Sequence, residues 1–135
     1  MTAAIRELRI EAPPLVLDPA REWPARTKRF HLGELTLYGT LWEDAGRPVG
    51  LALTANRLGS LERGTLATVG RLVTLALAGG VPCADVVREL RGTVFEPAGV
   101  SGDPAAPMVS SVLDWVGRWM EARCAAVPEE SDATN

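Results

Sequence analysis

The chain has 135 residues, of which 47% are hydrophobic and 23% charged, and its net charge is −3. This size and composition are typical of one globular domain with a single hydrophobic core. The acidic balance argues against a broad nucleic-acid surface. The longest apolar run, interrupted by Arg71 and Gly79-Gly80, is too short to span a bilayer.

The beginning of the chain lacks the pattern of a secretory signal, and we expect a cytoplasmic protein. Cys83 and Cys124 are expected to form neither a disulfide framework nor a metal cluster. Cys83 lies near a helix start, which can favour a reactive thiolate, but we expect it to be a buried structural thiol. Residues 1–25 are expected to form an N-terminal extension ahead of a domain that spans residues 26–125.

Alternating apolar residues between Glu34 and Trp42 predict a strand with one buried face. Turn residues follow at 45–48, where Gly46 suits a positive φ, and the segment from Val49 to Ala55 alternates again. These segments predict a meander of two or three antiparallel strands.

Apolar residues lie around most of the circumference of the segment Leu61–Ala78, which predicts the most buried helix of the fold. Ser60 is the expected N-cap, and Gly79-Gly80 ends the helix. Pro82 is expected to open a short second helix that Gly92 closes.

A third helix is predicted from Pro107 to Ala125, with Trp115 and Trp119 four residues apart at the border of its apolar face. We expect these two rings to form a homodimer interface, since one sheet leaves little to cover them. Residues 126–135 are acidic and are expected to be disordered. The predicted fold is α+β, a small antiparallel sheet of two to four strands packed against about three helices.

The sequence contains no P-loop, no dinucleotide-binding glycine motif and no nucleophile elbow. The single histidine, His31, has no apparent metal partner, and the spacing of the carboxylates, among them Glu96 and Asp114, does not mark a catalytic pair. No metal site and no cofactor are expected.

Two segments are candidates for ligand binding. The loop before the first helix offers backbone N–H groups and positive charge for a phosphate, through Arg57, Gly59, Ser60 and Arg63. A capped helix without a ligand explains the same residues. The second candidate is the proline-rich segment 94–107, in which Phe95 is expected to plug the core while Pro97 stiffens the backbone that presents Glu96. Alternatively, Glu96 has only a structural role and accepts backbone N–H hydrogen bonds that hold the turn.

Four segments in order resemble the C-terminal domain of adenosylcobalamin-dependent (class II) ribonucleotide reductases, a relative of the TSCPD domains. They read TKRFHLGELTLYGTLWEDAGRPVGLAL, RLGSLERG with the helix up to GGVPCADVVREL, FEPAG at Phe95–Gly99, and SVLDWVGRW. The resemblance covers Arg26 to Arg123 and implies that segment 94–107 is the joint between the second and third helices.

The reductases of the family that this chain resembles have two further parts. A large barrel holds cobalamin and substrate, and the chain commonly ends in a cysteine-rich tail. Neither is present in these 135 residues. We therefore expect no ribonucleotide reduction by the isolated chain, and cobalamin binding is not implied.

Three hypotheses follow. The first is an accessory domain that acts with a separate reductase chain or binds a nucleotide-like ligand. The second is a small enzyme that uses Glu96, Asp114 or His31 as acid–base groups. The third is a structural dimerisation module. A membrane partner is not expected, and a nucleic-acid partner is disfavoured by the charge.

Overall fold

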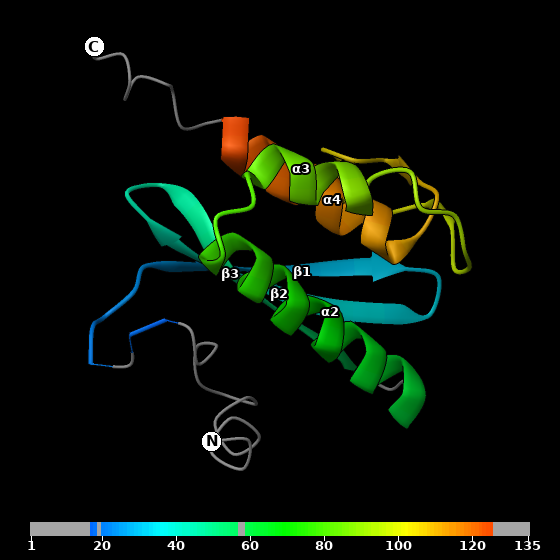
Figure 1. Ribbon diagram of the computed structural model, residues 1–135. Helices are drawn as coiled ribbons and strands as arrows, with labels where there is room; N and C mark the ends of the chain where they lie inside the picture. Colours follow the sequence, from blue (N-terminus) through cyan, green and yellow to red (C-terminus); the bar gives the residue numbers. More distant parts are fainter. Residues whose placement is uncertain (1–16, 19, 57–58, 126–135) are drawn as a thin grey trace.

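The computed structural model describes residues 17–18, 20–56 and 59–125 (Figure 1). The predicted N-terminal extension lies mostly outside these residues, and the predicted disordered tail lies entirely outside them. The described elements are β1 (Ala25–Leu32), β2 (Leu35–Asp44), β3 (Arg47–Asn56), α2 (Ser60–Ala78), α3 (Cys83–Leu90), β4 (Gly99–Val100), β5 (Met108–Val109) and α4 (Val112–Ala125). The α+β class predicted from the sequence is confirmed.

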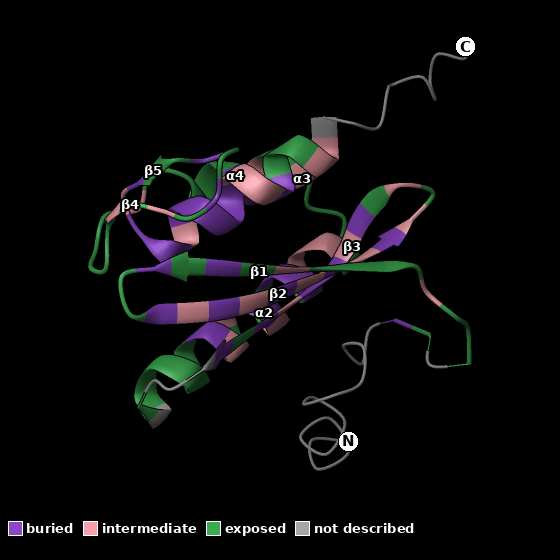
Figure 2. Ribbon diagram, turned by 180° about the vertical axis from the view of Figure 1, so that it is seen from behind, coloured by how far each residue is buried: buried purple, intermediate pink, exposed green. Residues whose placement is uncertain are grey.

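The main sheet is an antiparallel meander in the order β1-β2-β3. Its β2–β3 turn contains Ala45 and Gly46, whose φ values are 56° and 83°, as expected for a tight hairpin turn whose central residues both have positive φ. Along β2 every second residue is buried, beginning at Leu35 (Figure 2). One face of the sheet therefore carries the core, as the alternation predicted.

The helix α4 lies over this buried face and forms the centre of the core. Trp115, Val116 and Met120 have no exposed surface, and the indole of Trp115 stacks on Phe30 of β1 with 4.1 Å between ring centroids. The helix α3 packs beside α4 (Figure 1). Most of the buried aromatic surface thus lies between β1 and α4.

The prediction that residues 61–78 form the most buried helix is wrong. Leu61, Leu72 and Leu75 of α2 are 78%, 59% and 54% exposed, whereas α4 is buried on most sides. The reason is that α2 packs against β3, at the edge of the sheet, and contacts the rest of the molecule along one side. An apolar circumference does not reveal whether a helix is covered by its own chain.

The contact between α2 and β3 protects the sheet edge. The Thr74 hydroxyl accepts a hydrogen bond from the Leu51 N–H at 2.9 Å and lies 2.9 Å from the Gly70 carbonyl oxygen, to which it donates. A Cβ at Gly70 would come within 2.9 Å of the Leu51 carbonyl oxygen, so this residue allows the helix to approach the strand backbone. A helix that covers an edge strand in this way prevents pairing with other chains.

The predicted start of the third helix at Pro107 is wrong, because α4 begins at Val112. Met108–Val109 instead forms the strand β5, which pairs with β4. The Ser111 hydroxyl accepts a hydrogen bond from the Asp114 N–H at 2.9 Å, the geometry of an N-cap. The helix therefore starts where a side chain can satisfy its free N–H groups.

Gly39 of β2 provides the space for Trp119, and its replacement by alanine is expected to destabilise the fold. A Cβ at this position would lie 2.7 Å from Cζ3 of the rigid Trp119 ring, and overpacking of this kind costs about 1–3 kcal/mol. Gly39→Ala should lower the free energy of unfolding by this amount in urea denaturation. Gly102→Ala is the control, because its Cβ would make an ordinary contact at 3.8 Å. Equal stability of the two variants would contradict the close contact.

Candidate functional site

The segment 94–107 is held against the body of the domain by backbone hydrogen bonds. The Phe95 N–H donates to the Ser110 carbonyl oxygen at 3.1 Å, and the Ser101 N–H donates to that of Pro107 at 2.8 Å. A bridge between Leu32 and Ser101 links the segment to the end of β1. The segment connects α3 to α4, as the family resemblance implied.

Asp114 ties the two ends of this connection together. Its carboxylate accepts hydrogen bonds from the N–H of Gly92 at 2.8 Å and from that of Ser110 at 3.1 Å, and it pairs with Arg118 at 3.1 Å. Burial alone would raise the pKa of Asp114, but these donors and the Arg118 charge hold it below its usual value. The side chain therefore works as an ionised tie at the start of α4, and a role as general acid is not supported.

Asp103 connects the same segment to the core. One of its carboxylate oxygens accepts a hydrogen bond from the indole N–H of Trp115 at 2.7 Å and lies 2.9 Å from Nζ of Lys28. The other accepts from the Ala105 N–H at 2.9 Å. Burial opposes ionisation, yet the hydrogen bonds from Trp115, Lys28 and Ala105, with the Lys28 charge, keep the pKa of Asp103 below its usual range. The spacing of the carboxylates in the sequence does not indicate this role.

The FEPAG turn does not fill the core. Phe95 is 43% exposed, so the prediction that it plugs the interior is wrong; the interior position is occupied by the Phe30–Trp115 stack. Glu96 is exposed and makes no hydrogen bond or ion pair within the described part of the chain. The backbone ties expected of Glu96 are instead made by Asp103 and Asp114.

Large apolar side chains gather on the surface of this segment. Val100 of β4 and Met108 of β5 are directly paired across the two strands. They are 76% and 58% exposed, and Val94 is 80% exposed. We call these three exposed side chains, together with Phe95, the β4–β5 patch. The strands β4 and β5 lie in a largely exposed part of the fold (Figure 2). Exposed apolar clusters of this kind mark contact surfaces.

The predicted phosphate site lies partly outside the described residues and stays a prediction. Arg57 lies outside the described residues, as does the side chain of Ser60, while Gly59 and Arg63 are exposed. Gly59 rather than Ser60 is the N-cap of α2, and no side chain caps it. Figures 1 and 2 both show the β1–β2 hairpin turn between the start of α2 and segment 94–107. Pro97 approaches Gly33 of that turn, at 4.0 Å from an ideal Cβ.

Two hollows of the described surface lie elsewhere. One of about 390 Å³ lies between the β2–β3 turn, the end of α2 and the start of α3; one of about 290 Å³ lies between α3 and α4. Neither is lined by Gly59, Arg63 or Glu96. Among the described residues, no group of His, Cys, Asp and Glu is arranged to hold a metal ion. None of the described helices combines the length and apolarity that crossing a membrane requires.

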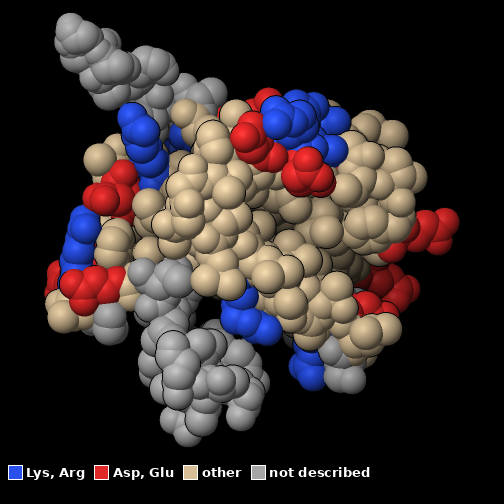
Figure 3. All heavy atoms as spheres, viewed as in Figure 1, with Lys and Arg blue, Asp and Glu red and all other residues tan. Residues whose placement is uncertain are grey.

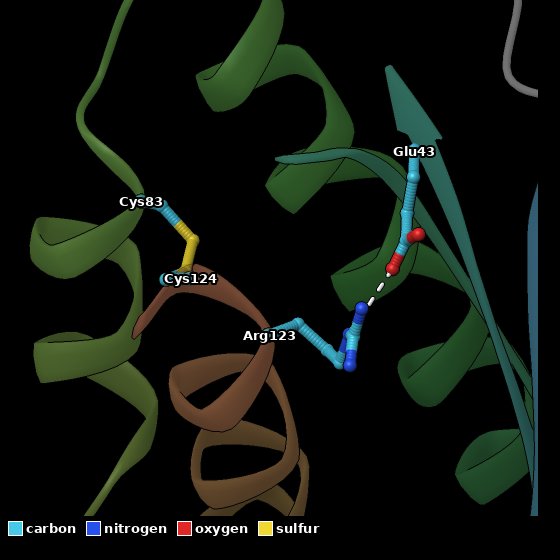
Figure 4. Close-up of a disulfide and its surroundings, with 4 residues drawn as sticks. All are labelled: Glu43, Cys83, Arg123 and Cys124. Atoms are coloured by element: carbon cyan, nitrogen blue, oxygen red, sulfur yellow. Dashed lines mark hydrogen bonds and ion pairs between the residues drawn. A yellow bond between two sulfur atoms is a disulfide. The ribbon is translucent and has the colours of Figure 1, made fainter. Parts of the chain in front are cut away.

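The predicted thiols are instead bonded to each other. Cys83, the first residue of α3, forms a disulfide with Cys124 near the end of α4, across a Cα–Cα distance of 6.3 Å (Figure 4). Residues 41 positions apart in sequence meet because α3 and α4 lie side by side. Next to Cys124, Arg123 points away toward Glu43 of β2 (Figure 4). The spacing of two cysteines carries no signal of such a pairing.

Glu43 is a buried carboxylate that joins three elements. It accepts hydrogen bonds from Nε of Arg26 at 2.8 Å and from Nε of Arg123 at 3.2 Å, which link β1 and the end of α4 to β2. Arg21 pairs with Asp44, and Lys28 with Asp103. Much of the positive charge near β1 is therefore neutralised within the chain.

The two tryptophans of α4 are placed differently from each other. Trp115 is fully buried in its own chain, so it is unable to contact a partner and its assignment to an interface is wrong. Trp119 is half-buried, stacked on Trp115 with 5.3 Å between centroids.

His31, which the sequence offered as an acid–base candidate beside Glu96 and Asp114, is exposed, and its ring Nδ1 lies 3.1 Å from the Thr36 hydroxyl oxygen, within hydrogen-bond distance.

Acid is expected to destabilise the fold through Asp103 and Asp114. Their folded pKa values lie below the ordinary value of 3.8, so their stabilisation is complete above that pH and is lost as the pH falls through the lowered values. Asp103→Asn should lower the free energy of unfolding by about 1.5–3 kcal/mol at neutral pH. In this variant the free energy of unfolding should also fall less steeply as the pH is lowered, measured by urea denaturation between neutral pH and the acid range. The exposed Asp85→Asn is the control. An unchanged acid slope in Asp103→Asn would contradict this role.

The disulfide is expected to stabilise the pair of helices. For a loop of this length, cross-linking typically adds about 2–4 kcal/mol. The double variant Cys83→Ser/Cys124→Ser should lose that amount in guanidinium denaturation and should not respond to dithiothreitol, whereas the unmodified protein should fall to the same stability when reduced. Two titratable thiols in the unreduced native protein would show that the bond is absent.

Comparison with known proteins agrees with the family resemblance. The TSCPD domain model matches residues 12–123, which extends the match into the predicted N-terminal extension. A vitamin B12-dependent ribonucleotide reductase of Rhodopirellula baltica is 31% identical over 75 residues, covering 56% of this chain and 7% of that protein. No solved structure matches the chain. This protein thus belongs to the TSCPD domain family and is similar to a small part of a vitamin B12-dependent ribonucleotide reductase.

Proposed function

We propose that the protein is an accessory domain that docks on a separate, adenosylcobalamin-dependent ribonucleotide reductase chain of class II, and so serves nucleotide metabolism in the cytoplasm. The family membership supports a domain that accompanies such an enzyme. The chain spans only 7% of the length of the reductase that it resembles. A domain of this size, with no described metal cluster, needs the large chain to supply cofactor and substrate sites.

The observation that carries the proposal is the β4–β5 patch. The connection between α3 and α4 is anchored by Asp103, by Asp114 and by backbone hydrogen bonds. It nevertheless presents Val94, Val100 and Met108 to solvent. A connection that is anchored by the buried Ala106 and Asp103, and that holds large apolar side chains outward, suits a preorganised contact surface. We place the reductase contact there.

Docking at this patch is expected to be lost when a charge is buried in it. Val100→Glu or Met108→Glu should weaken binding to the class II reductase chain of the same genome by roughly tenfold or more, measured by biolayer interferometry. Both side chains are exposed, so the melting temperature should hardly change. Val81→Glu, between α2 and α3, is the matched control, because this side chain is apolar and 41% exposed and lies outside the patch.

The outcomes of this experiment separate the candidate functions. Failure of the unmodified protein to bind the reductase chain, or binding that neither patch variant weakens, contradicts the proposal. Thermal stabilisation by nucleoside phosphates without any reductase chain would favour a ligand-binding function instead. If Glu96→Gln then removed that stabilisation, the ligand site would be at the FEPAG turn.

A further inference from the structure

One side of α2 is an apolar surface that nothing among the described residues covers. Its positions recur at spacings of three and four, so they share one face of the helix. All of them are exposed and uncharged: Leu61, Gly64, Thr65, Thr68, Leu72 and Leu75. We call this set the α2 face. It spans most of a 19-residue helix, about 28 Å in length.

This face departs from the pattern of a solvated helix. A surface helix normally carries charged residues opposite its buried stripe. In α2 the buried stripe includes Leu66, Gly70 and Val73, and the opposite side bears three exposed leucines. Figure 3, in the same view as Figure 1, shows a largely uncharged surface where α2 crosses the front of the molecule, with basic side chains at its margin. Such a surface favours a partner that is itself apolar.

The order of large and small residues along the α2 face is complementary to itself. When two copies of the helix lie antiparallel with Thr68 facing Thr68 of the second copy, Leu61 of one faces Leu75 of the other. In the same register Leu72 faces Gly64, which leaves space for its side chain. We propose that α2 is the homodimer interface of this protein, formed by an antiparallel pair of α2 helices around a two-fold axis at Thr68.

The arrangement satisfies the symmetry of a two-fold dimer, in which the same surface of both copies is used. No residue of the face itself is charged, but Arg71 borders it and donates a hydrogen bond to the Thr68 hydroxyl at 3.1 Å. The pair therefore requires the Arg71 guanidinium to stay at the solvent-exposed rim of the interface. One helix face is smaller than the roughly 800 Å² per partner of a standard interface. We therefore expect a reversible dimer whose population rises with protein concentration. This interface replaces the one predicted at the third helix, where Trp115 is fully buried.

The oligomeric state tests the proposal directly. Sedimentation velocity over the micromolar range should show a dimer fraction that increases with concentration. Leu72→Glu and Leu75→Glu should each weaken dimerisation by roughly tenfold or more, with the melting temperature of the monomer preserved because both positions are exposed. Met108→Glu in the β4–β5 patch should leave the dimer unchanged, which separates this proposal from reductase docking.

The register is tested by a bis-maleimide cross-linker on single cysteine variants, the native cysteines being paired in the disulfide. Thr68→Cys should cross-link to itself. Leu61→Cys alone should not, because the two copies of residue 61 would lie about 21 Å apart, but it should cross-link when mixed with Leu75→Cys. Efficient self-linking of Leu61→Cys would indicate a parallel pair and overturn the proposal.

A monomer at all concentrations would also overturn it, as would a dimer that Leu72→Glu leaves intact. A third outcome would also overturn the proposal: the full chain is a monomer, and it dimerises only after residues 1–16 are deleted. That result would mean that the N-terminal segment of the chain, and not a second copy, covers the face.

Discussion

The indole of Trp115 is the group on which most of the other contacts depend. Its ring stacks on Phe30 of the sheet on one side and on Trp119 on the other, while its N–H donates to the buried carboxylate of Asp103. A buried indole needs such a partner for its N–H, because an unpaired polar group in the core is costly. One side chain thereby fixes the position of α4 on the sheet and of segment 94–107 on α4.

The polar contacts around this stack explain why the SVLDW motif and the FEPAG turn occur together. Ser111 caps α4, Asp114 accepts N–H groups from both ends of the connecting segment, and Asp103 holds the segment's second turn. With these ties in place, the turn remains rigid without inserting Phe95 into the core. The apolar side chains of the β4–β5 patch are consequently presented from a fixed backbone, as a docking surface requires.

Some of this architecture could be predicted from local patterns. Period-2 alternation predicted the strands β2 and β3 with their turn, and helical spacing predicted α2 and α4, because both signals arise from a single buried face. Four motifs in order predicted the family. The ligand site stays a prediction. The sequence could not reveal the distance between the start of α2 and Glu96, and the β1–β2 turn lies between these two elements.

By itself, the sequence determined the α+β class, the order of the elements and the membership of the family, because these depend on residues close together in the chain. Only the tertiary structure decided which helix is central, how Cys83 reaches Cys124, and which carboxylates serve as ties. The physical reason is that burial and pairing depend on neighbours distant in sequence. A leucine of α2 and a valine of α4 look alike in a periodic pattern, yet α2 lies at the edge of the sheet and α4 lies over its centre.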